Sequence, residues 1–402
     1  MAQSKWCRVL TLSVLLQLGV AGCSTPQRLP AVPSASALQA DEGLGPIRFL
    51  VMRETDSFAE EARSAVVKEQ AWLASQRQSG PLPPASFLAI SGGGDNGAYG
   101  AGFLNGWTAS GKRPQFKVVT GVSTGALIAP FAFLGPKYDY VLDRVYTQTS
   151  QKDIFTKRGL KSLIWGDSMA DTAPLASVIA SYVTPEFLTE IAGEYAKGRV
   201  LLVGTTNLDS MEPVIWNMTA IAASKDPRSA QLFRSILLAS ASIPGAFPPV
   251  MLDVNVNGTP HQEMHVDGGT VAQVFFYPPS FSTAGAPDRK RTLYVIRNAR
   301  LDADWASTER RTMSIAMRAI DSLTRTQGIG DLYRIYTTTQ RDGIDFNLTY
   351  IPPTFTTPHT AQFETGYMQS LYKVGLDAAR TGYSWQKYPP GYDVPLHDQI
   401  SK

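Results

Sequence analysis

The 402-residue sequence contains only two cysteines and four histidines, and it has no marked excess of charge of either sign. Both cysteines, Cys7 and Cys23, lie near the N-terminus, so no disulfide is expected in the fold and its stability must come from packing. The 37 basic and 34 acidic residues give a net charge of +3, without the basic surplus that nucleic-acid binding requires. We therefore expect a globular protein that has no nucleic acid among its partners.

The apolar run at residues 9–21 follows a basic start and is too short to span a bilayer comfortably. It ends in Val20-Ala21-Gly22-Cys23, which resembles the lipobox of bacterial lipoproteins, where the cysteine is acylated and becomes the first mature residue. We expect a lipoprotein signal peptide over residues 1–22 and lipidation of Cys23; the alternative is an ordinary signal peptide that contains a cysteine by chance. By resemblance to Gram-negative lipoproteins, Ser24 favours anchoring at the outer membrane, facing the periplasm.

The remainder of the chain divides into a tether and one domain. Residues 23–45 are rich in Pro, Ala and Ser without a hydrophobic period, which predicts a flexible tether. No repeat, heptad run or long linker follows, so we expect a single domain over residues 46–402. Two successive units of strand, glycine turn and helix indicate an α/β fold, a three-layer α/β/α arrangement with a central, mostly parallel sheet.

Hydrophobic periodicity predicts most of the elements. Strands are expected at residues 47–52, 87–90, 117–120, 199–204, 214–218, 292–298 and 346–351, and helices at 56–76, 98–110, 126–134, 185–196, 230–240, 308–326 and 364–380. A hairpin is also readable, because residues 250–256 alternate, Asn257-Gly258 is a strong two-residue turn, and the return strand ends at Asp267.

The stretch ISGGGDNGAYGAGFLNGW, residues 90–107, contains glycines that fit the dinucleotide-binding pattern G-x-G-x-x-G. That function also requires an acidic residue about 20 positions further on, and the next strand ends instead in a G-x-S-x-G turn. A P-loop is excluded because no Lys-Ser or Lys-Thr pair follows the glycines. A purely structural turn and a loop that binds the oxyanion of acyl transfer remain as alternatives.

The second glycine turn, Gly121-Val122-Ser123-Thr124-Gly125, has the form of a nucleophile elbow. A strand ends there and a helix begins, so Ser123 at the apex is forced into the open. The helix N-terminus behind it directs N–H groups toward the place where an oxyanion would form.

A serine nucleophile needs a base, and the chain offers few histidines for this role. An ordinary α/β-hydrolase triad would use His359 or His397, but neither lies in a context that would orient an imidazole, and His261 and His265 are expected to be structural. Asp267, at the end of the hairpin, is the better candidate, because a carboxylate shielded from water gains basicity. The alternative is an aspartate that only stabilises a tight turn.

Four motifs in this order resemble the patatin-like phospholipase family. They are Ser91-Gly92-Gly93-Gly94-Asp95-Asn96-Gly97, Gly121-Val122-Ser123-Thr124-Gly125, residues 239–249 (ASASIPGAFPP) and Asp267-Gly268-Gly269. The match covers roughly residues 87–270, and the four motifs together are far more specific than any one alone.

The resemblance implies a patatin-like fold and a serine–aspartate dyad that hydrolyses acyl esters of lipids through an acyl-enzyme. Ser123 would be the nucleophile and Asp267 the base, and the N–H groups of Gly92, Gly93 and Gly94 would form the oxyanion hole. The motif glycines Gly97, Gly121, Gly125, Gly268 and Gly269 would support this geometry. No metal or cofactor is implied, and the expected partner is membrane phospholipid or another acyl-ester lipid.

Three questions stay open at this point. The family usually has Arg or Lys at the position of Asn96, so this residue puts rate or substrate preference in doubt. A catalytically silent envelope lipoprotein that binds lipid or protein, and an acyltransferase, are the alternatives to a hydrolase. Phe275-Phe276-Tyr277 would line an acyl groove or pack in the core, and residues 308–380 would be a C-terminal helical elaboration or a lid.

Overall fold

The computed structural model describes residues 26–159, 166–283, 285–303, 305 and 307–392. The predicted signal peptide, the lipidation site Cys23 and the candidate base His397 lie outside the described residues.

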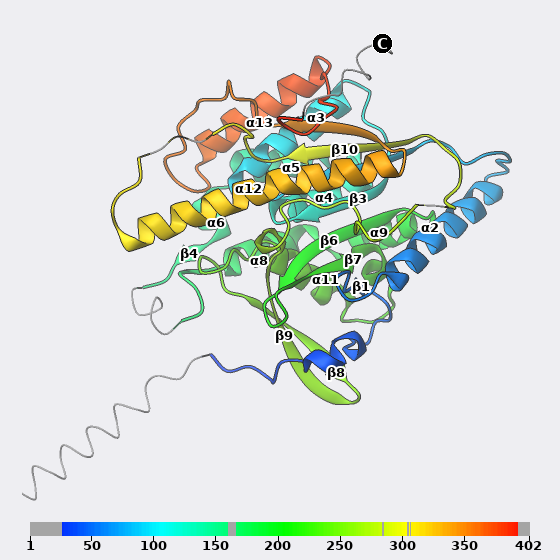
Figure 1. Cartoon of the computed structure of the whole chain (residues 1–402), viewed down its shortest axis with the longest axis horizontal. Coiled ribbons are helices and arrows are strands. Elements are labelled where there is room, and N and C mark those ends of the chain that lie inside the picture. The colour runs from blue at the N-terminus through cyan, green and yellow to red at the C-terminus, as the bar shows by residue number, and fades with distance from the viewer. Residues whose placement is uncertain (1–25, 160–165, 284, 304, 306, 393–402) are drawn as a thin grey trace, which may run out of the picture.

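A nine-stranded sheet forms the centre of the molecule, with the strand order β1-β7-β6-β3-β2-β10-β11 and with β9 joining β6 to β8 (Figure 1). The five strands from β6 to β11 in this order run parallel, whereas β7, β1 and β9 pair antiparallel. The strands are β1 Arg48–Phe49, β2 Ala85–Ile90, β3 Phe116–Val122, β6 Val200–Asn207, β7 Glu212–Asn217, β8 Val250–Val256, β9 Thr259–Asp267, β10 Arg291–Arg297 and β11 Asp345–Tyr350, and a separate pair consists of β4 Thr156–Lys157 and β5 Ala170–Asp171. The mostly parallel sheet that the sequence predicts is confirmed.

Helices cover both faces of this sheet. Those that share the largest hydrophobic cluster are α3 Gly97–Ala109, α4 Thr124–Leu134, α5 Asp139–Gln148, α6 Gln151–Ile154, α8 Ala173–Tyr182, α9 Pro185–Ala196, α10 Met218–Ala223, α11 Ser229–Ser240 and α13 Thr365–Arg380. The opposite face is covered by α2 Asp56–Ser75 and by the long helix α12 Thr312–Arg341, which crosses the front of the molecule in Figure 1. Short 3₁₀ turns are η1 Ser34–Gln39, η2 Gly94–Asn96, η3 Pro136–Tyr138 and η4 Gly268–Thr270. The three-layer α/β/α class is therefore confirmed.

The central strands are buried on both faces, which explains why they read as continuous apolar runs rather than alternating ones. In β2, Leu88 and Ile90 join the cluster under α3 and α4, while Phe87 and Ala89 join the cluster under α12. The carboxyl ends of β2, β3 and β6 consequently meet at one edge of a rigid, dry layer, where ligand sites of open α/β sheets are found.

Two predicted elements differ from the structure. The strand expected at residues 47–52 is only Arg48–Phe49, because a turn follows at once. The helix expected at 308–326 begins later and continues to Arg341, since its second half packs against the sheet through Leu332 and Ile335. Gly328 inside it weakened the helical signal, yet a Cβ there would lie 2.3 Å from the guanidinium of Arg297, so close packing requires glycine.

The described part of the predicted tether has defined contacts. Arg28 pairs with Asp209 at 2.7 Å, and the backbones of Asp41 and Asn255 exchange two hydrogen bonds of 3.0 and 2.8 Å. Residues 26–45 therefore lie along the β8–β9 hairpin, at the lower edge of Figure 1. The composition predicted a flexible tether in this segment. Its defined contacts form because polar groups of the segment pair with polar groups of the edge strand β8.

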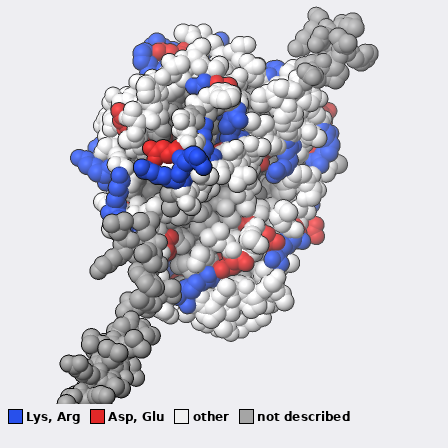
Figure 2. All heavy atoms as spheres, turned by 60° about the vertical axis from the view of Figure 1, so that its left-hand side comes forward, with Lys and Arg blue, Asp and Glu red and all other residues white. Residues whose placement is uncertain are grey.

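Charges on the surface are mixed in sign. On the face shown in Figure 2, Lys and Arg side chains lie in small groups with Asp and Glu, and uncharged surface separates the groups. Ion pairs are also present on the surface of the described residues, such as Lys373 with Asp377 at 2.6 Å. Over the described ranges, no helix combines the length and the apolar character that crossing a membrane demands.

Candidate active site

Ser123 lies between the last residue of β3 and the first of α4, in a strained backbone conformation. Its φ of 55° and ψ of −127° are unusual for a residue with a side chain, and such strain is concentrated at functional sites. The turn is held tightly, because the Ser123 N–H donates to the Ser240 hydroxyl at 3.0 Å. The structure thus has the strand–turn–helix geometry that a nucleophile elbow requires.

The motif glycines permit very close backbone packing around this turn. A Cβ at Gly125 would lie 2.3 Å from the carbonyl oxygen of Ile90, and one at Gly121 would lie 2.4 Å from that of Gly125. Similar clashes would arise at Gly97 with Thr124, at Gly268 with Gly204 and at Gly269 with Gln273. The clashes with backbone oxygens at Gly121, Gly125 and Gly268 exclude a larger residue at these three positions for steric reasons.

Asp267 ends strand β9 beside the elbow, and it is 5% exposed. Burial raises its pKa to about 7, although hydrogen bonds from the Ser123 hydroxyl and the Gly269 N–H act in the opposite direction. The Gly269 N–H donates to Oδ1 at 2.7 Å. Within the described part of the chain no cation pairs with this carboxylate, which is buried and hydrogen-bonded to the serine hydroxyl.

The small-residue stretch at 239–249 ties the two motifs together. The Ser240 hydroxyl accepts from the Ser123 N–H and donates to the Gly204 carbonyl at 2.7 Å. Two residues on, the Ser242 carbonyl accepts from the Asp267 N–H at 2.9 Å. In the sequence, this stretch was notable only for its resemblance to the family. The contacts show its structural role, which is to connect the turn at Ser123 to the strand that ends at Asp267.

The glycine loop packs directly on the elbow, since a Cβ at Gly92 would lie 3.1 Å from the Cβ of Ser123. The expectation of three oxyanion donors needs correction, because the Gly92 N–H donates to the Gln273 carbonyl at 3.0 Å. Among the described residues, the N–H groups of Gly93 and Gly94 have no protein acceptor. These two donors remain available for a developing oxyanion.

Gln273 and Asp331 support the loop, and the sequence analysis missed both. The Gln273 side chain donates to the Gly269 carbonyl at 2.7 Å, and its backbone N–H donates to Asp331 on α12 at 2.6 Å. Gln273 thereby connects the glycine loop to the turn after Asp267. Gln273 follows the fourth motif, Asp267-Gly268-Gly269, in the sequence, but no pattern marks Asp331, which lies beyond the predicted end of its helix.

The three histidines that the structure describes contact neither Ser123 nor Asp267. His359 donates to Asp95 of the glycine loop at 2.7 Å, and this hydrogen bond raises the pKa of the imidazole. His265 is fully buried between Thr205 and Glu263, as a structural residue would be, and burial lowers its pKa. The exposed ring of His261 faces backbone carbonyls of the N-terminal segment.

Asn96 is held by the C-terminal helix. Its Oδ1 accepts a hydrogen bond of 2.6 Å from the hydroxyl of Tyr367 on α13. The side-chain carbonyl is thus satisfied, and the amide remains the polar group that Asn96 presents in place of a cationic side chain.

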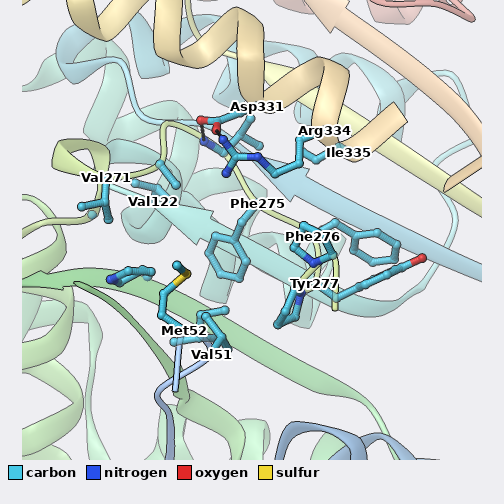
Figure 3. A pocket seen from close by; sticks show the side chains of 18 of the residues that line it. Val51, Met52, Val122, Val271, Phe275, Phe276, Tyr277, Asp331, Arg334 and Ile335 are labelled. Atoms are coloured by element: carbon cyan, nitrogen blue, oxygen red, sulfur yellow. Dashed lines mark hydrogen bonds and ion pairs between the residues drawn. The ribbon is translucent and has the colours of Figure 1, made fainter. Parts of the chain in front are cut away.

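Two apolar cavities adjoin the site, one on each face of the sheet. The first, of about 320 Å³, is bounded by Val122 and Gly268, the neighbours of Ser123 and Asp267. Figure 3 shows Phe275 at its centre, with Met52 on one side and Asp331 and Arg334 on the other. Phe276 packs in the core and also borders this cavity, and Phe275 faces it. The second cavity, about 70 Å³ and narrower, begins at Thr124 beside the nucleophile.

No candidate metal centre was found in the described ranges, where no three or more His, Cys, Asp or Glu side chains are grouped suitably. The chemical groups that this arrangement brings together are a buried carboxylate, a serine in a strained conformation and two free backbone donors.

Residues 88–278, a little under half of the chain, match the family model described as patatin-like phospholipase. No curated protein sequence matches the chain significantly.

Among solved structures, VipD from Legionella pneumophila matches with 13% identity and a TM-score of 0.32, over 74% of this chain and 66% of that one. ExoU from Pseudomonas aeruginosa, solved in complex with SpcU, matches with 12% identity and a TM-score of 0.34, over 75% and 52%. Human GIVD cytosolic phospholipase A2 matches with 10% identity and a TM-score of 0.29, over 74% and 53%. The chain thus spans about half to two thirds of the length of these structures.

Proposed function

We propose that the protein is a lipid acyl hydrolase of the phospholipase A or lysophospholipase type, because residues 88–278 match the patatin-like phospholipase family model. It cleaves carboxylic esters through an acyl-enzyme on Ser123. The observation that carries this proposal is the hydrogen bond from the Ser123 hydroxyl to Asp267, a carboxylate whose pKa is raised to about 7 by burial. A base with a pKa near the working pH is best suited to accept that proton.

In the first half of the reaction, Asp267 takes the hydroxyl proton as Ser123 Oγ attacks the ester carbonyl. The negative charge that develops on the carbonyl oxygen is stabilised by the N–H groups of Gly93 and Gly94, each such donor typically contributing about 10² to 10³ in rate. Protonated Asp267 then gives its proton to the departing alcohol.

In the second half, a water molecule takes the place of the alcohol. Asp267 removes a proton from this water, the resulting hydroxide attacks the acyl carbon, and the fatty acid leaves as Ser123 recovers its proton. An acyltransferase would follow the same steps with another alcohol in place of water.

The test compares Ser123→Ala with His359→Ala on phospholipid vesicles and on short-chain aryl esters. Ser123→Ala should lose at least about 10⁴-fold in kcat/KM, because the nucleophile is gone. His359→Ala should retain activity within about threefold, since its imidazole contacts Asp95 rather than the dyad. Loss of activity in His359→Ala equal to that of Ser123→Ala would establish an ordinary triad instead. Wild-type protein without turnover on any lipid or ester would favour a silent lipid-binding lipoprotein, and transfer to added alcohols in preference to water would favour an acyltransferase.

We also propose that Cys23 is acylated and anchors the protein at the outer membrane, facing the periplasm. The support is the lipobox-like sequence that ends at Cys23. Labelled palmitate should enter the wild-type protein in cells and be absent from Cys23→Ser; equal labelling of both would refute the anchor. Fractionation of the envelope then locates the labelled protein.

A further inference from the structure

A third cavity, of about 660 Å³, lies between helix α2 and the central sheet. Its floor comes from the first halves of three parallel strands, with Phe87 of β2, Val118 of β3 and Val200 of β6. The nucleophile elbow stands at the opposite, carboxyl end of β3. Ligand sites in proteins typically have volumes of about 300–1,000 Å³, so this cavity is large enough to hold a ligand away from the dyad.

Helix α2 spans this cavity instead of packing on the sheet along its whole length. Of its 20 residues, only Phe58 and Glu69 are buried. These two residues are about 16 Å apart along the helix axis, at a rise of 1.5 Å per residue. Ala62 and Val66 lie between them, line the cavity and are half-buried. The inward face of α2 therefore leaves apolar surface that a ligand can cover.

The end of the cavity near Phe58 is aromatic. The Phe58 ring packs edge-on against the rings of Phe49 and Phe281, with centroids 5.2 and 5.3 Å apart. Phe276 and Tyr277 line the same cavity, and both also border the cavity of Figure 3, so they separate the two spaces. Such walls favour a hydrocarbon chain.

The end of the cavity near Glu69 is basic. Lys117 and Arg289 each pair with the Glu69 carboxylate at 2.9 Å, so two cations share one carboxylate. Arg291, the first residue of β10, donates to two neutral oxygens at 2.9 and 2.8 Å, and among the described residues no carboxylate pairs with it. An anionic head group would offset the positive charge that remains at this edge.

The charges along the whole described lining have the same balance. Four basic and two acidic side chains line the cavity: Arg63, Lys117, Arg289, Arg291, Glu61 and Glu69. Arg63 and Val67, on α2, are exposed to solvent, so the cavity is accessible beside this helix. A ligand that matches these walls has one hydrocarbon chain and one negative charge.

We propose that the cavity under α2 binds a fatty acid. Its carboxylate lies against the basic edge formed by Lys117, Arg289 and Arg291, and its hydrocarbon chain extends toward Phe58 and Phe281. This second site is separate from the catalytic dyad, and the inference goes beyond the proposed hydrolase function.

The test measures binding of dodecanoate and of the uncharged dodecan-1-ol by calorimetry. All variants are made in the Ser123→Ala protein, in which no acyl-enzyme can form. Ala62→Trp and Val66→Trp fill the cavity from α2. Ala71→Trp is the matched control, because it is exposed on the same helix outside the lining, and Val51→Trp fills the cavity of Figure 3 instead.

Ala62→Trp and Val66→Trp should each weaken dodecanoate binding about tenfold or more, because the indole ring takes the space of the chain. The two controls, Ala71→Trp and Val51→Trp, should stay within about twofold. Absence of dodecanoate binding, or an equal loss in either control, would overturn the assignment.

Arg291→Met tests the basic edge. It removes a cation that has no carboxylate partner, so no buried acid is left unpaired. Dodecanoate should bind about tenfold more weakly to this variant, whereas binding of dodecan-1-ol should not change. An equal effect on both ligands, or on neither, would reject this edge as the site of the carboxylate.

Hydrolysis separates the second site from the substrate site. With Ser123 intact, Ala62→Trp should keep kcat/KM for an aryl dodecanoate within about threefold. A fall that matches the loss of dodecanoate binding would make the cavity part of the substrate site and overturn the inference. If the wild type hydrolyses no ester, the hydrolase function fails, and the binding pattern still decides whether the fatty acid site exists.

Discussion

Glu263 and Asp267 lie four residues apart on strand β9 and are both buried, at 2% and 5% exposure, yet their environments differ sharply. Glu263 accepts from the Arg48 guanidinium at 2.7 Å and from His265 at 3.1 Å. Burial alone would raise the pKa of Glu263, but these partners outweigh it and hold that pKa below its usual value. Asp267 has only a hydroxyl and a backbone N–H as partners, and burial raises its pKa to about 7.

The difference separates a structural carboxylate from a reactive one on the same strand. A buried carboxylate with a cation is neutralised and holds elements together, whereas one without a cation stays basic and costs stability.

The largest effect is expected for Asp267→Asn. The amide cannot accept the serine proton, so kcat/KM for an aryl ester should fall about 10³ to 10⁴-fold. The melting temperature should stay the same or rise, because an uncompensated buried charge is removed. The control is Glu263→Gln, which should lower stability and keep kcat/KM per folded molecule. Equal losses of activity in the two variants would contradict the division of roles.

Next in size is the effect of Arg48→Ala, since Arg48 lies on strand β1 and pairs with Glu263 of β9. This change leaves Glu42 and Glu263 buried without their cation, which should cost about 3–5 kcal/mol in the free energy of unfolding. Urea denaturation measures this quantity. Arg53→Ala is the matched control, because its exposed pair with Glu212 should contribute about 1 kcal/mol or less. A loss no larger than that of the control would mean that Arg48 does not compensate the two carboxylates.

The pH dependence tests the raised pKa directly. Only ionised Asp267 can accept the proton, so kcat/KM should fall about tenfold per pH unit below 7, or about a hundredfold at pH 5. Stability changes in the opposite sense: since the folded pKa lies above the unfolded value, the contribution of this group is fully present below pH 4 and is lost as pH rises through 7. Rate profiles and unfolding from pH 4 to 8 should show both trends, and Asp267→Asn should abolish the second. A flat rate profile down to pH 5 would contradict the assignment.

A smaller effect is expected for Ser240→Ala. The variant leaves the N–H of Ser123 without its acceptor, which should cost about 1–3 kcal/mol in stability and about tenfold in kcat through a looser elbow. Thermal unfolding and single-turnover kinetics report the two effects. Ser235→Ala on the same helix, whose hydroxyl accepts only from Gln231 on that helix, serves as control. Wild-type kcat in Ser240→Ala would show that the backbone alone holds the nucleophile.

Much of the site was predictable because its chemistry is encoded in short segments. The turns at Ser123 and Asp267 each require glycines within a few residues of the functional side chain. The motifs can therefore be recognised in the sequence as short patterns. The fold class followed from the same patterns together with hydrophobic periodicity. Gln273, Asp331 and the pairing of Asp95 with His359 were not predictable, because each contact joins segments far apart in the chain.

By itself the sequence determined the α/β class, the order of the elements, and the serine and aspartate that stand at the ends of two strands. Only the tertiary structure decided that the Gly92 N–H is already used, that Asp267 meets no cation, and that an apolar cavity opens beside Thr124. The physical reason is one of range. Periodicity and turn chemistry act over a few residues, whereas burial, hydrogen-bond partners and cavities depend on which distant segments pack around each group.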